Sequence, residues 1–124
     1  MEARPIGVTR FRSSLAHTIS TIGDIGLREW VRSTEDLLTN LLPGYLLIDL
    51  QRLGVSGATG GRRLAHHRGP GGEALVTEQW FVPFGGQGHT LTATVETNRY
   101  PALADVIREC ARQWHPTETS ADVR

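Results

Sequence analysis

Apolar and polar positions alternate through the middle of the chain with a period of two, the spacing typical of β-strands. Residues 73–84 and 89–96 form two such runs, and Gly-Gly-Gln-Gly at 85–88 separates them. In the second run Leu91, Ala93 and Val95 share one face, and threonines occupy the other. A glycine-rich turn between two β-rich runs predicts a hairpin. We expect the rest of the chain to pair with this hairpin or to cover it.

Further strands are predicted before the hairpin. Residues 45–53 begin with a run that is apolar on both faces, which indicates a central strand covered on both sides. Residues 54–61 are interpreted as a turn, and residues 62–68 as a more polar strand that pairs back. A short strand is expected at 5–12, and the Ser- and Thr-rich segment 13–23 is interpreted as a connection.

Two segments change to a spacing of three and four residues, which predicts amphipathic helices. The first helix is expected to start at Asp24 as N-cap and to end at Pro43-Gly44. Its stripe is Leu27, Trp30, Val31, Thr34, Leu37, Leu38 and Leu41. The second is expected to open at Tyr100-Pro101 and to stop at His115-Pro116. Its stripe is Leu103, Val106, Ile107, Cys110 and Trp114.

The predicted order is therefore strand, helix, four strands in a meander, helix. Consecutive strands joined by short loops must be antiparallel, and helices with apolar stripes need a sheet to pack on. The fold class expected is α+β, an antiparallel sheet of about five strands packed between the two helices as an α/β/α sandwich. One domain should span 1–124, with 1–4 and 117–124 flexible.

Composition excludes several classes of function. The formal net charge is zero, which argues against a nucleic-acid surface or a polybasic membrane surface. All 13 cationic side chains are Arg, so a Schiff-base lysine and a P-loop lysine are excluded. The glycine clusters lack the strand–loop–helix context of phosphate-binding loops and are interpreted as turns. No cofactor is expected.

Cysteine usage and the N-terminus bear on location. A single cysteine, Cys110, excludes an internal disulfide and a multi-cysteine metal site. Its place on the second helical stripe predicts a small buried hydrophobe. The N-terminus has no apolar signal-peptide core, and no apolar run approaches the ~18 residues of a membrane span. These features favour a cytoplasmic protein without a membrane partner.

Glu78 is the one charged residue on an otherwise apolar strand face. A buried carboxylate needs a partner, and Arg62 or Arg63 on the neighbouring predicted strand is suited to supply one. Two interpretations remain open, a structural ion pair and a polar contact at the floor of a ligand cleft. The tryptophans Trp30, Trp80 and Trp114 are expected to meet in the core, with one of them able to line such a pocket.

The histidines raise the question of a metal site. His66 and His67 are adjacent, so on a regular strand they point to opposite faces and do not grip one ion together. A site would need one of them to face His89 across the sheet, with Glu78 as a third ligand. The alternative, solvated or half-buried imidazoles, is the interpretation we adopt, and no metal ligand is predicted.

Several segments together resemble the LpqN-type family of actinobacteria. They are LPGYLLID from Leu42, GRRL from Gly61, EQW from Glu78, LTATV from Leu91 and YPAL from Tyr100. The family's fold is similar to that of the photosystem subunit PsbP and the Ran-binding Mog protein. The resemblance implies an antiparallel sheet between helices and implies no catalytic residues. Relatives often begin with an extra strand that this sequence lacks, and many carry a lipidation cysteine that is also missing.

Two functional hypotheses follow. The first is a small non-catalytic interaction or accessory module, whose partner is another protein or a second copy bound through a sheet edge with unpaired amides. The second is a ligand-binding or enzymatic pocket between sheet and helix. Its candidate contacts are Glu78, Trp80, His66, His89 and Arg62.

Overall fold

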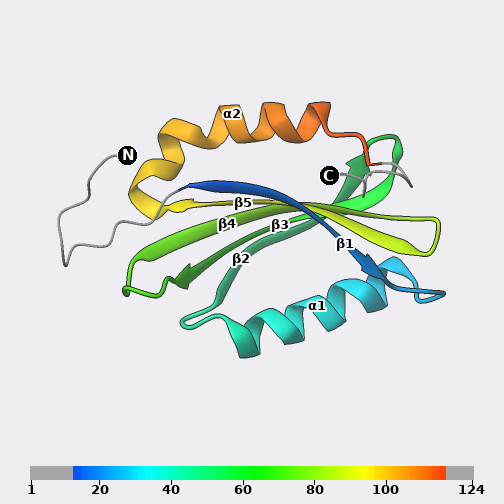
Figure 1. Cartoon of the computed structure of the whole chain (residues 1–124), viewed down its shortest axis with the longest axis horizontal. Coiled ribbons are helices and arrows are strands. Elements are labelled where there is room, and N and C mark those ends of the chain that lie inside the picture. Colours follow the sequence, from blue (N-terminus) through cyan, green and yellow to red (C-terminus); the bar gives the residue numbers. More distant parts are fainter. Residues whose placement is uncertain (1–12, 117–124) are drawn as a thin grey trace.

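The chain folds as three layers, with a five-stranded antiparallel sheet between two helices (Figure 1). The computed structural model describes residues 13–116. Its elements are β1 (Ser14–Thr21), α1 (Leu27–Leu41), β2 (Leu46–Val55), β3 (Ala58–Arg68), β4 (Ala74–Phe84), β5 (Gln87–Glu96), the short 3₁₀ helix η1 (Thr97–Arg99) and α2 (Tyr100–Gln113). The predicted α+β class is confirmed, and so is the order of the elements from the first helix onward.

The strands lie in the order β1-β5-β4-β3-β2, and every neighbouring pair is antiparallel. The predicted hairpin is β4 and β5, and it places Trp80 opposite Leu91. β4 is the middle strand, and both of its faces are covered. For that reason nearly all of it is buried, including the polar residues Thr77, Glu78 and Gln79.

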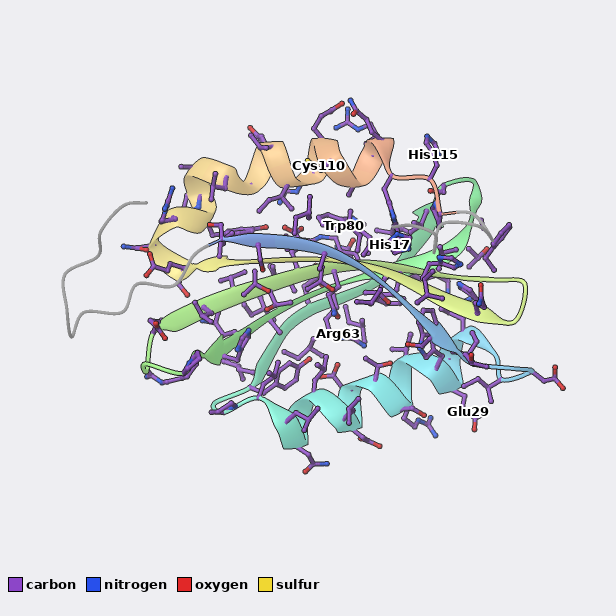
Figure 2. All side chains as sticks on the ribbon, viewed as in Figure 1. His17, Glu29, Arg63, Trp80, Cys110 and His115 are labelled. Atoms are coloured by element: carbon purple, nitrogen blue, oxygen red, sulfur yellow. The ribbon has the colours of Figure 1, made fainter. Side chains whose placement is uncertain are left out.

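The two faces of the sheet hold different cores. Under α2 lies the main hydrophobic cluster, formed by Val76, Trp80, Leu91, Ala93, Val95 and Ile107. Under α1, Trp30 packs edge-on against Phe81, with ring centroids 5.7 Å apart. Figure 2 shows Trp80 on the α2 side of the sheet and Arg63 on the α1 side.

The expectation that the three tryptophans meet is wrong. Trp114 packs against the cluster that contains Trp80, whereas Trp30 lies on the other side of the sheet. Trp30 contacts Phe81, and residues 80 and 81 point to opposite faces because side chains alternate along a strand. The sheet itself therefore separates Trp30 from Trp80.

The segment interpreted as a connection is in fact strand β1. Its residues pair with β5 from Ser14 opposite Thr94 to Thr21 opposite Gln87. An edge strand needs only one paired side, and the Ser and Thr side chains of β1 are exposed to water. The strand predicted at 5–12 lies outside the described residues.

The turn predicted at 54–61 is much shorter than expected. Only Ser56 and Gly57 separate β2 from β3, and both have a positive φ, 53° and 83°. Gly61 lies inside β3. A side chain would not fit at this position, because a Cβ on residue 61 would stand 2.6 Å from the Phe81 ring. Glycine here marks close packing within a strand rather than a turn.

Helix α1 starts later than predicted, whereas its end at Leu41, just before Pro43-Gly44, agrees with the prediction. It starts after Gly26, which caps it without a side-chain hydrogen bond, so Asp24 is not the N-cap. Only Trp30 of the predicted stripe is fully buried, and Leu37 and Leu41 remain 55% and 63% exposed.

Within residues 13–116 no helix combines the length and apolarity needed to cross a membrane.

Strand β2 is the second edge of the sheet, not the central strand predicted from its apolar run. Its Leu46, Leu47, Ile48 and Leu50 are 63%, 37%, 47% and 40% exposed. The register with β3 shifts between Leu47 and Asp49, which leaves Ile48 as the extra residue of a bulge. The apolar residues on both faces of this strand predicted that both faces are buried. That prediction is wrong, because within the described part of the chain much of the strand is exposed.

Candidate functional site

A buried ion pair lies beneath α2. Glu78 is fully buried, and its Oε2 accepts a hydrogen bond of 2.6 Å from Nε of Arg62. The hydroxyl of Tyr100 donates to the other oxygen, Oε1, at 2.8 Å. Nη1 of Arg62 also donates to Asp49 at 3.2 Å. Both oxygens of the Glu78 carboxylate are therefore satisfied by neighbours.

The register of the sheet explains why Arg62 rather than Arg63 is the partner. Leu64 lies directly opposite Glu78, so Arg62, two residues along β3, shares the face of Glu78 and reaches it diagonally. Arg63 points to the other face. There it donates to Glu35 of α1 at 2.9 Å and to Gln79 at 2.7 Å.

The protonation of this network follows from its surroundings. Burial alone would lower the pKa of Arg62, but the hydrogen bond and charge of Glu78 raise it above its usual value. Burial, and then the hydrogen bond to Glu78, raises the pKa of Tyr100. Arg62 therefore remains charged, and Tyr100 remains a hydrogen-bond donor at neutral pH.

A cavity of about 500 Å³ opens beside this network, between the second half of α2 and strands β2 and β3. Its apolar floor is formed by Leu53, Val55 and Trp80. Its polar lining includes Arg62 and, from α2, Arg108 and Arg112. This volume lies within the usual range of small-molecule sites, ~300–1,000 Å³.

Both ends of α2 are tied to the sheet side of the cavity. Tyr100 at the start of the helix binds Glu78, as described above. At the other end, the Ser56 hydroxyl in the β2–β3 turn donates to the carbonyl oxygen of Trp114. Because the helix is held at both ends, the cavity between them has defined walls.

Of the predicted site residues, the structure brings Arg62, Glu78 and Trp80 together. Arg62 and Trp80 line the cavity, whereas Glu78 lies behind Arg62 and orients it. His66 pairs with Val76 near the opposite end of the sheet. His89 pairs with Val82.

The alternative of a metal site with His66 or His67, His89 and Glu78 is contradicted by these positions. Val76 and Val82 are six residues apart on β4, a separation of roughly 20 Å along a strand. His67 lies on the other face, where its Nε2 is 2.7 Å from Oγ1 of Thr77. Within residues 13–116 no group of three His, Cys, Asp or Glu side chains is placed to hold a metal ion.

His89 has a different neighbour, His17 of β1. The two rings approach at 3.2 Å between Nε2 of His17 and Nδ1 of His89, and the ring of Trp114 stands edge-on to His17. His89 is fully buried, and burial, followed by the nearby His17, lowers its pKa. The pair was not predicted, because residues 13–23 were interpreted as a connection and not as a strand beside His89.

Three other residues of the site were missed. Tyr100 was interpreted only as a helix start, and Arg108 and Arg112 were not singled out. The arginines are four residues apart and so lie on one helical face, a signal visible in the sequence. Which strands that face overlooks depends on how α2 lies on the sheet.

The comparisons with known proteins concern the fold. No protein-family model and no curated protein matches the sequence. PA94 from Pseudomonas aeruginosa, a protein of unknown function described as a candidate regulator, has a similar structure with a TM-score of 0.76 and 13% identity, over 92% of this chain and 89% of that one. LpqN from Mycobacterium tuberculosis, described as involved in cell envelope biogenesis, is similar with a TM-score of 0.63 and 17% identity, over 82% of this chain and 61% of that one. The fold is thus distantly LpqN-like.

Proposed function

We propose that this protein is a non-catalytic interaction module whose partner is a second copy of the same chain, paired through the outer edge of β2. The observation that carries the proposal is the exposed apolar row of that edge, Leu46, Leu47, Ile48 and Leu50. An edge strand presents unpaired N–H and C=O groups along its open side. The open edge of the sheet and the exposed apolar residues therefore belong to the same strand, β2.

The geometry of β2 favours a copy of itself as the occupant. An isologous contact sets one surface patch against its own image. A twofold axis perpendicular to the sheet makes two copies of an edge strand run antiparallel. All neighbouring strands of this sheet pair in the same way. The apolar residues of one β2 would then cover those of the other. A second copy therefore supplies both the backbone partners and the apolar cover.

The opposite edge, β1, offers a weaker case. Most of its side chains are polar, with Ser14, Thr18, Ser20 and Thr21 among them. Its exposed apolar residue is Leu15, 51% accessible. A shallow groove of about 170 Å³ between α1 and β2, lined in part by Leu27, Val31 and Leu50, extends the apolar surface on the β2 side. A groove of about 210 Å³ between β1 and α2, lined in part by Leu15, Val106 and Ile107, is apolar as well. The preference for β2 therefore rests on its four exposed apolar residues, against one on β1.

The non-catalytic role rests on how the buried polar groups are used. The carboxylate of Glu78 has both oxygens occupied by Arg62 and Tyr100, and so it is not free to act as a general base. On the other face, Arg63 is held between Glu35 and Gln79. These groups hold the layers together.

The proposal extends to family and location. The motifs in the sequence and the likeness of fold to LpqN support membership of the LpqN-type actinobacterial family with its PsbP/Mog-like fold. The single cysteine supports a cytoplasmic location. Fractionation of cells that express the untagged protein, with the bulk of it in the envelope fraction, would contradict that location.

The dimer is tested by light scattering over a wide concentration range, with charge reversal at the edge. Wild-type protein is expected to give the mass of a dimer. Ile48→Lys and Ile48→Glu are each expected to give monomers, because like charges would face one another across the twofold axis. An equimolar mixture of the two variants should recover a dimer, which shows that both are still folded.

Leu15→Lys is the matched control, since it places the same charge on the other edge of the sheet. It should leave the dimer intact. A wild-type chain that stays monomeric at high concentration would overturn the proposal. Dissociation by Leu15→Lys, with the Ile48 variants still dimeric, would overturn it equally.

A further inference from the structure

The cavity under α2 concentrates positive charge. Arg108 and Arg112 extend from the helix, and Arg62 from the sheet, toward the same space. Among the described residues that line it, none carries a carboxylate. The lining therefore presents three cationic side chains and no anionic one.

Each arginine of the cavity has a carboxylate neighbour outside the lining, but the pairs made by Arg108 and Arg112 are weak. Arg112 has an ion pair of 2.9 Å with Glu109, and both side chains are largely exposed, which makes the pair weak. The nearest approach of Arg108 to Asp105 is 4.0 Å. Like charges four residues apart on a helix repel one another. A bound anion would relieve this repulsion.

Arg62 differs from the other two because it is already positioned. Its side chain is 12% exposed, and Glu78 and Asp49 bind its Nε and Nη1. Tyr100 also lies beside this guanidinium, and among the described residues the third nitrogen, Nη2, has no ion pair with a carboxylate. A remaining N–H group of a guanidinium held in this way can donate a charge-assisted hydrogen bond to a carboxylate, sulfonate or phosphate group.

The floor of the cavity provides an apolar contact surface for a ligand. Trp80, Leu53 and Val55 form an apolar surface beside the guanidinium groups. Small-molecule sites typically combine an apolar lining with a few polar groups that fix orientation. An inorganic anion would use the arginines and leave this floor uncovered.

We propose that the cavity under α2 binds a small organic anion, with its acidic group on Arg62, Arg108 and Arg112 and its apolar body on Trp80 and Leu53. The cavity is lined by the second half of β2 and the turn after it, from Gln51 to Ser56, whereas the proposed dimer edge uses the apolar row between Leu46 and Leu50. The variant that removes the two helical arginines of the cavity changes only α2 and leaves that row intact. The success or failure of the anion site is therefore distinguishable from that of the proposed dimer.

The test uses isothermal titration calorimetry with the full chain and three probes. Naphthoate carries an anionic group on a flat apolar body, naphthamide has the same body without the charge, and inorganic phosphate has the charge without the body. Naphthoate is expected to bind with one molecule per chain and at least about tenfold more tightly than either other probe, the difference expected for one charge-assisted hydrogen bond. Equal affinity for naphthamide or phosphate would overturn the proposed class of ligand.

The variants locate the site. Arg108→Gln/Arg112→Gln should weaken naphthoate binding by at least about tenfold. Arg32→Gln/Arg99→Gln, which removes the same charge from two exposed positions outside the cavity, should leave it unchanged. Both double variants should unfold at the same denaturant concentration as the wild type, because all four side chains are exposed. The absence of naphthoate binding by the wild type, or equal losses in the two double variants, would overturn the proposal.

Discussion

Glu78 and Arg62 form a short ion pair, 2.6 Å between Oε2 and Nε, in which the carboxylate is fully buried and the guanidinium nearly so. The pair joins β3 and β4, two neighbouring inner strands, and through Tyr100 it reaches the first turn of α2. Removing one member of a buried pair leaves the other charge without compensation. Stability should therefore be most sensitive to this position.

We expect Glu78→Gln to lower the free energy of unfolding by about 3 kcal/mol, since Arg62 would stay charged without its main partner. Urea unfolding followed by tryptophan fluorescence measures the change. Glu109→Gln, which breaks an exposed ion pair with Arg112, is the control and should cost less than about 0.5 kcal/mol. A Glu78→Gln variant as stable as the wild type would show that the pair is not required.

Arg63→Lys tests the ion pair on the other face. Arg63 donates to Glu35 and Gln79 from separate nitrogens and stacks over Phe81, with its Cζ 5.2 Å from the ring centroid. A lysine ammonium is a point charge that does not reproduce this fork. The expected loss is about 1–3 kcal/mol in unfolding free energy. The same change at exposed Arg112 should have almost no effect, and similar losses at both positions would refute the role assigned to Arg63.

The buried histidines predict a loss of stability in mild acid. Burial is the main reason that the pKa values of His67 and His89 lie below the ordinary value of 6.5. The unfolded chain therefore binds protons more readily than the folded one as the pH falls, and stability present above about pH 6.5 is lost below it.

Thermal unfolding between about pH 7.5 and pH 5 measures this loss, with a lower Tm expected at the acidic end. His89→Gln should reduce the difference in Tm between the two ends of the range, because one of the groups whose pKa is lowered by burial is gone. A Tm that stays constant or rises as the pH falls would contradict the prediction.

Gly88→Ala tests the packing of Trp30. A Cβ at Gly88 would stand 2.3 Å from the Trp30 ring, so the indole must move from its contact with Phe81. We expect a loss of about 1–3 kcal/mol, typical of overpacking, measured by urea unfolding. Gly54→Ala is the control, because the atom nearest to the added Cβ, the carbonyl oxygen of Ala58, would lie 3.9 Å away. Combining Gly88→Ala with Trp30→Leu should recover part of the loss, and no recovery would point to a different cause.

Part of the site was predictable from neighbouring positions in the chain. A charged residue on an apolar strand face indicated that Glu78 needs a cationic partner, and the partner is present. The choice between Arg62 and Arg63 was not predictable in this way. Side chains alternate along a strand, and a register shift of one residue would exchange the two. That register depends on the length of the β3–β4 turn and on contacts across the sheet.

The period of apolar residues was sufficient for the class of fold, the β4–β5 hairpin and both helices, because each of these depends on interactions between residues close in the chain. The position of a strand within the sheet depends on which segments remain to pair with it. β1, from a segment rich in Ser and Thr, takes the edge beside β5, and the apolar β2 is left at the other edge. The exposed row on β2 and the arginine-lined cavity under α2 therefore arise from contacts between distant segments, whose relative positions no local pattern records.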